Sequence, residues 1–217
     1  MIIAIDGPSG AGKGTVARAI AKRLGFRHVD SGAMYRAVGW KALRDGVAFD
    51  DEPTVAAIAS GADLRVSDEA VTIDGTDVTR AIRTPEIDRA ATAVARLPQV
   101  RAALVARQRA HGQQGGIVME GRDIGTVVFP HADVKVYLDA SPDERARRRA
   151  QDPAHSGGPV AVADVATALT ARDELDRTRL VSPLYAAPDA VIVDTTGKSI
   201  DDVVAMVMSL VEAREGT

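Results

Sequence analysis

The sequence predicts an α/β fold in which a parallel five-stranded sheet carries helices on both faces. Short runs rich in Val and Ile alternate along the chain with segments of helical periodicity, and this alternation is typical of parallel sheets covered on both sides. The chain has 217 residues, of which 46% are hydrophobic, so it can bury a sizeable core. The expected strands are Ile2–Asp6, Arg27–Asp30, Ile117–Glu120, Val134–Asp139 and Ala190–Asp194.

The loop after the first strand is the most informative segment. It reads Gly7-Pro8-Ser9-Gly10-Ala11-Gly12-Lys13-Gly14-Thr15, and a helical pattern follows it. Glycines let backbone N–H groups approach an anion, the helix dipole favours negative charge, and a lysine here reaches the outer phosphates. The usual pattern has Ser or Thr directly after the lysine, whereas Gly14 intervenes before Thr15. The segment predicts a phosphate loop (P-loop) for a nucleoside triphosphate or a close relative of one.

Capping residues mark where several helices begin. Thr84 and Ser141 each stand directly before a proline, and proline suits the first position of a helix. Ser199 is placed to cap the last helix, with Asp201 and Asp202 in its first turn. Pro98 separates a helix expected at about 85–97 from another at about 99–111.

Two segments interrupt the alternation of strands and helices. Leu64–Val66, Val71–Ile73 and the turn Asp74-Gly75 predict a small antiparallel insert at about 63–80. The stretch 152–159 is rich in Gly, Pro and Ser, which predicts a mobile loop.

Composition excludes several classes of protein. The net charge is −3, with 27 basic and 30 acidic residues, so we expect no nucleic-acid partner and only a local positive field. Cys is absent, which excludes disulfides and thiolate chemistry. No apolar run approaches the roughly 20 residues that span a bilayer, and no signal peptide is visible, so we expect a cytoplasmic chain. The four histidines lack metal-ligand spacing, and we expect them to be structural.

A helix expected at about 160–180 carries charges where apolar residues belong. Val165, Leu169, Arg172, Asp176 and Arg179 fall along one face, at spacings of three and four residues. Unpaired charges pointing inward would be very costly. The stripe predicts either an internal ion-pair cluster or the wall of a cleft for an anionic, hydroxylated ligand. Two arginines flanking a carboxylate suit the cleft.

Basic residues also precede the mobile loop. Arg145, Arg147, Arg148 and Arg149 predict either a solvated helix face or a lid that closes over phosphates. The sequence leaves both interpretations open.

Two further segments follow strands and suit an anion. Ser31 is placed to cap a helix and Arg36 lies about one turn further in, which makes a candidate second anion site. Arg122 and Asp123 stand between glycines after the third strand, and this arrangement favours a loop that faces a ligand.

A triphosphate loop together with a second set of arginines suits phosphoryl transfer between two bound nucleotides. An acceptor phosphate is mostly dianionic at neutral pH because its second pKa is about 6, so the reaction needs no general base. Arginines, Lys13 and Mg²⁺ bound with ATP would neutralise the two polyanions and the charge on the transferred group. A lid would suppress hydrolysis of the donor by excluding water.

Four motifs follow one another along the chain. They are Gly-Pro-Ser-Gly-Ala-Gly-Lys-Gly-Thr, Asp-Ser-Gly-Ala-Met-Tyr-Arg, Glu-Gly-Arg-Asp-Ile-Gly-Thr-Val-Val-Phe-Pro and Arg-Asp-Glu-Leu-Asp-Arg-Thr-Arg. In this order they resemble the bacterial cytidylate kinases over almost the whole chain. The Gly-Lys-Gly-Thr departure is itself usual among nucleoside monophosphate kinases. The resemblance implies transfer of a phosphoryl group from ATP-Mg²⁺ to CMP or dCMP.

The resemblance also implies an organisation of the chain. A core would comprise 1–31, 111–146 and 161–217, a monophosphate-binding region 32–110 would include the insert at 63–80, and a short lid would span 147–160. We expect the protein to act as a monomer.

Residue roles follow by matching motifs. The resemblance implies that Ser31, Arg36 and Arg122 hold the acceptor phosphate, that Arg172 and Asp176 face the ribose, and that Arg179 faces the phosphates. Thr92, Arg101 and Asp123 match the positions that read cytosine; Thr92 is the weakest match, since relatives often carry Ser there. The expected catalytic residues are Lys13, Arg122, Arg148, Arg172 and Arg179, and the ATP site is the whole segment from Gly7 to Thr15.

Three other functions are alternatives to this one. A regulatory GTPase needs an Asn-Lys-x-Asp guanine reader, and this chain has no asparagine. A small-metabolite kinase of the shikimate type shares the core but needs neither the insert nor the charged stripe. A nucleotide-binding module without catalysis would bind ATP and not consume it when an acceptor is supplied.

Overall fold

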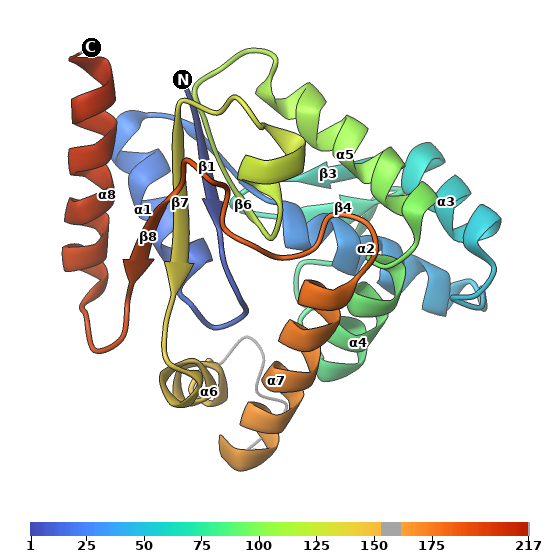
Figure 1. Ribbon diagram of the computed structural model, residues 1–217. Coiled ribbons are helices and arrows are strands. Elements are labelled where there is room, and N and C mark those ends of the chain that lie inside the picture. The colour runs from blue at the N-terminus through green and yellow to red at the C-terminus, as the bar shows by residue number, and fades with distance from the viewer. Residues whose placement is uncertain (153–161, 217) are drawn as a thin grey trace.

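A five-stranded parallel sheet forms the centre of the protein in a computed structural model that describes residues 1–152 and 162–216. The strands follow the order β2-β6-β1-β7-β8 (Figure 1). Their bounds are β1 Ile2–Asp6, β2 Arg27–Asp30, β6 Ile117–Gly121, β7 Val134–Asp139 and β8 Val191–Asp194. Each agrees with the predicted strand to within one residue, because a short run rich in Val and Ile that is bounded by loop residues leaves little choice of boundary.

Side chains of the sheet alternate between two separate apolar layers. Ile3 and Ile5 of β1 pack with Val16 and Val207 on one face, whereas Ala4 between them packs on the other. All three β1 side chains are fully buried. The period of two that defines a strand therefore divides the core into two halves.

The helices cover both faces and the carboxyl edge of the sheet (Figure 1). Helices α1 (Lys13–Leu24) and α8 (Ile200–Glu215) lie on one face. The other face carries α2 (Ser31–Arg44), α3 (Glu52–Gly61), α4 (Pro85–Val94) and α5 (Pro98–Gly112). Two more, α6 (Pro142–Ala150) and α7 (Val162–Thr178), pack against each other beyond the carboxyl ends of the strands.

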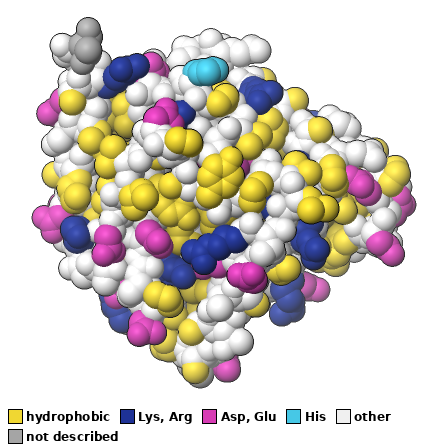
Figure 2. Space-filling view, viewed as in Figure 1, with side chains coloured by type: hydrophobic (Ala, Val, Ile, Leu, Met, Phe, Trp, Pro, Cys, Tyr) yellow, Lys and Arg dark blue, Asp and Glu magenta, His cyan; other side chains and the backbone are white. Residues whose placement is uncertain are grey.

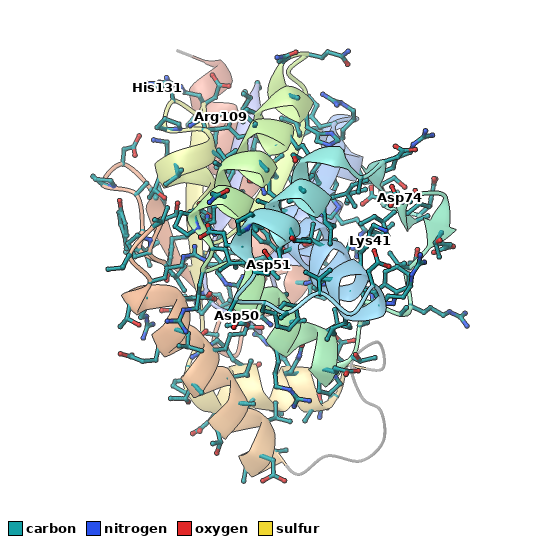
Figure 3. The ribbon with its side chains drawn as sticks, turned by 90° about the vertical axis from the view of Figure 1, so that its right-hand side faces the viewer. Lys41, Asp50, Asp51, Asp74, Arg109 and His131 are labelled. Carbon is teal, nitrogen blue, oxygen red and sulfur yellow. The ribbon has the colours of Figure 1, made fainter. Side chains whose placement is uncertain are left out.

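The antiparallel insert is present as predicted. Its strands are β3 (Leu64–Val66), β4 (Val71–Ile73) and β5 (Thr76–Asp77). Asp74 and Gly75 both have positive φ, at 49° and 74°, as the tight turn between β4 and β5 requires. Lys41 of α2 contacts Asp74 at 3.0 Å, so an ion pair fastens this turn to α2 (Figure 3).

Two elements have no counterpart among the predicted ones. Helix α3 begins where Asp51 accepts a hydrogen bond from the Thr54 amide, but its apolar face is narrow. A π-helix spans Ile124–Val128. Its first two amides donate hydrogen bonds to the side chain of Asp6, which lies 118 positions before Ile124. Local sequence patterns do not contain a contact of that range. Helix α4 ends at Val94 rather than 97, and Leu97, directly before Pro98, has the extended geometry that a following proline favours.

Within residues 1–152 and 162–216, no helix has both the length and the apolar character needed to cross a membrane. The lid predicted at 147–160 lies only partly inside the described residues. Its first residues form the end of α6, and 153–160 fall outside what the structure describes.

Candidate active site

The P-loop places the N-terminus of α1 at the carboxyl edge of the sheet. Gly7 has a φ of 144°, and a Cβ there would lie 2.0 Å from the Leu138 carbonyl oxygen, so only glycine fits. Gly12 caps α1 with a φ of 90° and offers no side chain to its amides. The first N–H groups of α1 therefore remain available to an anion.

Lys13 is the first residue of α1, and its side chain is buried. Its Nζ donates a hydrogen bond to the Pro8 carbonyl oxygen at 2.8 Å, and only 7% of the residue is exposed. Burial, together with the nearby Arg122, lowers the pKa of Lys13 to about 7. A polyanion beside Lys13 would restore the charged form, since an opposite charge favours ionisation.

A cavity of about 910 Å³ joins the P-loop to the monophosphate region. Its lining includes residues of α1, α2, α4, α5, α6 and α7 and of the turn after β6. Figure 2 shows Lys and Arg side chains interleaved with acidic ones on the face where α7 lies. The predicted residues that line the cavity are Ser9, Gly10, Ala11, Gly12, Lys13, Gly14, Thr15, Ser31, Arg36, Thr92, Arg101, Arg122, Asp123, Arg148, Arg172, Asp176 and Arg179.

Two of the predicted ATP-site residues, Gly7 and Pro8, are not among the lining residues. Gly7 packs against the backbone of β7, and the Pro8 carbonyl holds Lys13. Gly7 and Pro8 therefore support the conformation of the P-loop and do not face the cavity.

The predicted cap of α2 is wrong. Asp30, not Ser31, is the N-cap, and its side chain accepts a hydrogen bond from the Ala33 amide at 3.0 Å. Ser31 instead donates to the Glu120 carbonyl oxygen at 2.6 Å, which ties α2 to β6. Asp30 also pairs with Arg36 at 2.6 Å and so orients Arg36, which is one of the residues predicted to bind the acceptor phosphate.

The charged stripe of α7 faces the cavity, and its charges are also held in ion pairs. Asp176 contacts Arg122 at 3.0 Å and Arg179 at 3.6 Å. Burial opposes ionisation of Asp176, but Arg122 and Arg172 hold its pKa below the usual range. The two interpretations of the stripe thus describe one arrangement, in which the ion pairs form the wall of the cavity.

Arg101 and Asp123 form a second buried pair in the cavity wall. Their side chains are 2% and 6% exposed, and Arg179 lies 3.8 Å from the same carboxylate. The Arg101 guanidinium also stacks over the Tyr35 ring at 5.4 Å. The hydroxyl of Thr92 donates to the Asp88 carbonyl at 2.9 Å. A flat, polar group entering here meets a carboxylate, a guanidinium and an aromatic ring.

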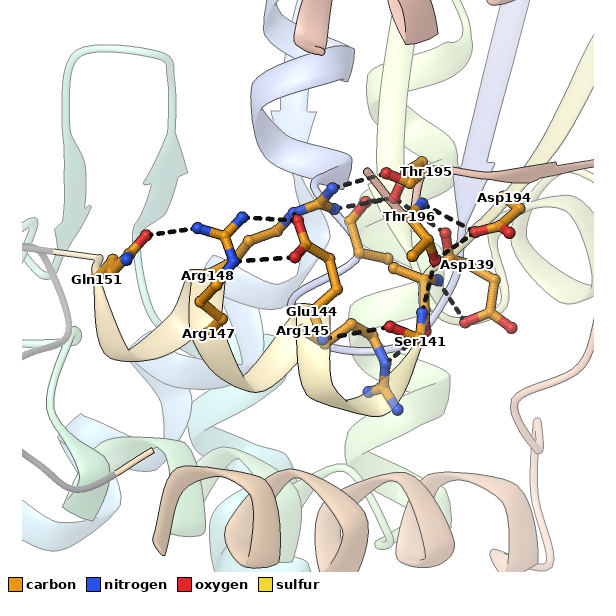
Figure 4. A network of polar contacts seen from close by, with 12 residues as sticks. Asp139, Ser141, Glu144, Arg145, Arg147, Arg148, Gln151, Asp194, Thr195 and Thr196 are labelled. Atoms are coloured by element: carbon orange, nitrogen blue, oxygen red, sulfur yellow. Dashed lines mark hydrogen bonds and ion pairs between the residues drawn. The ribbon is translucent and has the colours of Figure 1, made fainter. Parts of the chain in front are cut away.

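The arginines of α6 have separate surroundings (Figure 4). Arg147 is exposed and pairs with Glu144. Arg148 also contacts Glu144 and donates to the Thr195 hydroxyl and carbonyl, at 2.9 and 2.7 Å. Arg145 is buried under the P-loop, where it donates to the Ser9 carbonyl at 3.1 Å. Of these, Arg147 alone matches the solvated-face interpretation.

Two acids of the site, Asp88 and Asp173, are not among the residues that the sequence predicts. Asp88 of α4 contacts both Arg149 and Arg172. Asp173 pairs with Arg145 at 2.5 Å. Each partner lies 28 or more positions away, so no motif joins them. One local signal was available, since Asp88 stands one helical turn before Thr92 on the same face of α4.

Among the described side chains, no group of three or more His, Cys, Asp or Glu is arranged to hold a metal ion by itself.

Residues 3–213 match the family model for cytidylate kinase. The cytidylate kinase of Desulfitobacterium hafniense (strain Y51) is 49% identical over 211 residues, which cover 96% of this chain and 91% of the relative. That of Solibacter usitatus (strain Ellin6076) is 47% identical over 216 residues, covering 99% and 93%. Among solved structures, a gluconokinase from Sinorhizobium meliloti 1021 aligns with a TM-score of 0.52 at 15% identity, covering 99% of this chain and 93% of that one. The last likeness shows a shared fold.

Proposed function

Because the chain belongs to the cytidylate kinase family, we propose that it transfers the γ-phosphoryl group of ATP to CMP or dCMP, yielding ADP and CDP or dCDP. The observation that carries the proposal is one cavity that is lined both by the P-loop and by the Arg101–Asp123 pair. A triphosphate donor and a base-bearing acceptor would meet between them.

The donor would bind at the start of α1. Residues from Gly7 to Thr15 form this end of the site, with free amides at the helix N-terminus and Lys13 beside them. Thr15 lines the cavity, and its hydroxyl is an oxygen donor of the kind that Mg²⁺ accepts in addition to phosphate oxygens and water. Magnesium bound with ATP supplies charge neutralisation of the phosphates.

The acceptor phosphate would bind among the arginines. We assign its contacts to Ser31, Arg36 and Arg122, the ribose to Arg172 and Asp176, and the phosphates near the transfer point to Arg179. Two neighbouring, half-buried cations, Arg122 and Arg172, would offset the repulsion between two polyanions. No general base is needed, since the acceptor phosphate is already largely ionised.

The acceptor base would lie against Arg101, Asp123 and Thr92. Cytosine presents an amino donor where uracil has a carbonyl oxygen, and a carboxylate accepts a hydrogen bond only from the amine. The proposed division of labour also assigns 32–110 to acceptor binding and 147–160 to a lid, with Arg148 at its base. We further propose that the chain acts in the cytoplasm, and that it acts as a monomer, since one chain supplies both the P-loop and the Arg101–Asp123 pair.

The decisive test is ADP formation from ATP-Mg²⁺ with CMP, dCMP, UMP, AMP, GMP and shikimate offered one at a time. We expect turnover with CMP and dCMP at least about tenfold above the rest. Shikimate belongs in the panel because small-metabolite kinases share the core fold. Intact ATP binding without ADP release for any acceptor would contradict the proposed function.

A further inference from the structure

Asp6 is a buried carboxylate that the proposed function does not use. It is the last residue of β1, directly before the P-loop, and it is 4% exposed. Its two oxygens accept hydrogen bonds from the amides of Ile124 and Gly125, at 2.8 and 2.7 Å. These amides open the π-helix that follows Arg122 and Asp123.

The amides of Ile124 and Gly125 would normally be capped by Asp123, the residue directly before the π-helix. An aspartate before a helix commonly bonds its side chain to the first free amides. Here Asp123 stands at the N-cap of the π-helix without making such a bond. Its carboxylate points instead to Arg101 and Arg179 in the cavity wall. Because Asp6 occupies both amides, Asp123 is free to face the cavity.

We propose that Asp6 is a positioning residue for recognition of the acceptor base. By capping Ile124 and Gly125 it keeps Asp123 turned towards Arg101, and it ties this turn to the strand that carries the P-loop. The inference rests on the proposed function, in which Asp123 reads the acceptor.

The space around Asp6 leaves little freedom for another arrangement. A Cβ at Gly125 would lie 3.4 Å from the Asp6 carboxylate and 3.3 Å from the Lys135 side chain. Lys13 and Asp123 are the charged groups that act on Asp6, with opposite effects on its ionisation. Only a carboxylate offers an acceptor to both amides, because an asparagine in its place would turn an NH₂ group towards one of them.

Steady-state kinetics of Asp6→Asn, with CMP and UMP as acceptors, test this role. We expect KM for CMP to rise about tenfold and the CMP:UMP preference to narrow, with KM for ATP within about threefold of the unaltered protein. The matched control is Asp133→Asn at the opposite end of β1, where Asp133 accepts a hydrogen bond from the Ile2 amide at 2.7 Å. This control should leave both acceptor parameters unchanged. An unchanged CMP:UMP ratio in Asp6→Asn, or an equal loss for both acceptors and ATP, would overturn the assignment.

A second variant and a second measurement do not depend on that substitution or on activity. Gly125→Ala keeps the Asp6 carboxylate, but its added methyl group would displace the turn that contains Asp123. This variant should therefore also narrow the CMP:UMP preference, to a smaller extent than Asp6→Asn. Amide hydrogen exchange by NMR, without substrates, should accelerate at Ile124 and Gly125 in Asp6→Asn and stay constant in Asp133→Asn. Unchanged exchange at these amides would overturn the role of Asp6, whereas failure of the unaltered protein to use any nucleotide would overturn the proposed function alone.

Discussion

Asp123 is both half of a buried ion pair and, by proposal, the reader of the acceptor base. Its pairing with Arg101 compensates the cost of burying the charge, and it fixes where the carboxylate points. A group held in this way discriminates well, because an incoming carbonyl oxygen would meet an acceptor that cannot move aside.

Asp123→Asn should therefore narrow the CMP:UMP ratio of kcat/KM by about tenfold or more, mainly through weaker use of CMP. An amide keeps the shape but offers a donor to uracil. The matched control is Asp30→Asn, which removes the partner of Arg36 in the same cavity and should lower transfer to CMP and UMP alike. A preserved ratio in Asp123→Asn would remove this residue from the base site.

Asp6 predicts a specific dependence of stability on pH. Burial raises its pKa from 3.8 to about 6, although two backbone hydrogen bonds act in the opposite direction. The folded state thus binds the proton more tightly, so the stabilisation from Asp6 is complete below pH 4 and is lost as pH rises through about 6. Between pH 5 and 7.5, the free energy of unfolding should fall by about 1 kcal/mol relative to Asp6→Asn. Urea unfolding of both proteins at the two pH values measures this, and a constant or growing difference would contradict it.

The residues of the site were predictable where they belong to contiguous motifs. Lys13, Arg36 and Asp123 each stand beside residues that identify their chemistry. Asp88 and Asp173 escaped prediction because their roles come from partners on other helices, which only the tertiary structure brings near.

At the scale of elements, α6 combines a buried brace with an exposed charged face. Arg145 reaches Asp173 of α7 at 2.5 Å, and both side chains are less than 8% exposed. Arg147, two positions on, pairs with Glu144 at 2.8 Å but is 53% exposed. A solvated pair contributes little to stability, whereas breaking a buried one leaves a charge without its partner.

Asp173→Ala should accordingly lower the free energy of unfolding by about 3–5 kcal/mol. Arg147→Ala on the same helix pair should change it by less than about 1 kcal/mol. Urea denaturation of the two variants provides the comparison. Equal effects would show that the Arg145–Asp173 pair does not fasten α6 to α7.

The elements themselves were predictable to different degrees. The strands of the main sheet and the caps at Thr84, Ser141 and Ser199 follow from local chemistry, and the structure confirms them. The start of the π-helix does not, because it is held by Asp6, which lies more than a hundred positions earlier in the sequence. An element whose geometry depends on one distant carboxylate has no local signature.

At the scale of the whole molecule, the charge of the cavity is opposite to that of the protein. The net charge is −3, yet twelve basic side chains and six carboxylates line the cavity. A cleft with one dominant sign of charge concentrates field lines and attracts ligands of the other sign. The positive potential is therefore local to the site, as the composition led us to expect.

This asymmetry predicts that salt slows capture of the acceptor more than it slows transfer. Raising KCl from 50 to 300 mM shortens the distance over which charges act, from roughly 14 to 6 Å. At saturating ATP and constant free Mg²⁺, kcat/KM for CMP should fall about fivefold while kcat stays within about twofold. The variant Arg18→Ala removes a cation at the cavity wall whose side chain is 51% exposed, and it should reduce the salt dependence without changing kcat. If kcat/KM proved insensitive to salt, the arginines would act only through contacts with the bound nucleotide, because their field would not reach into solution.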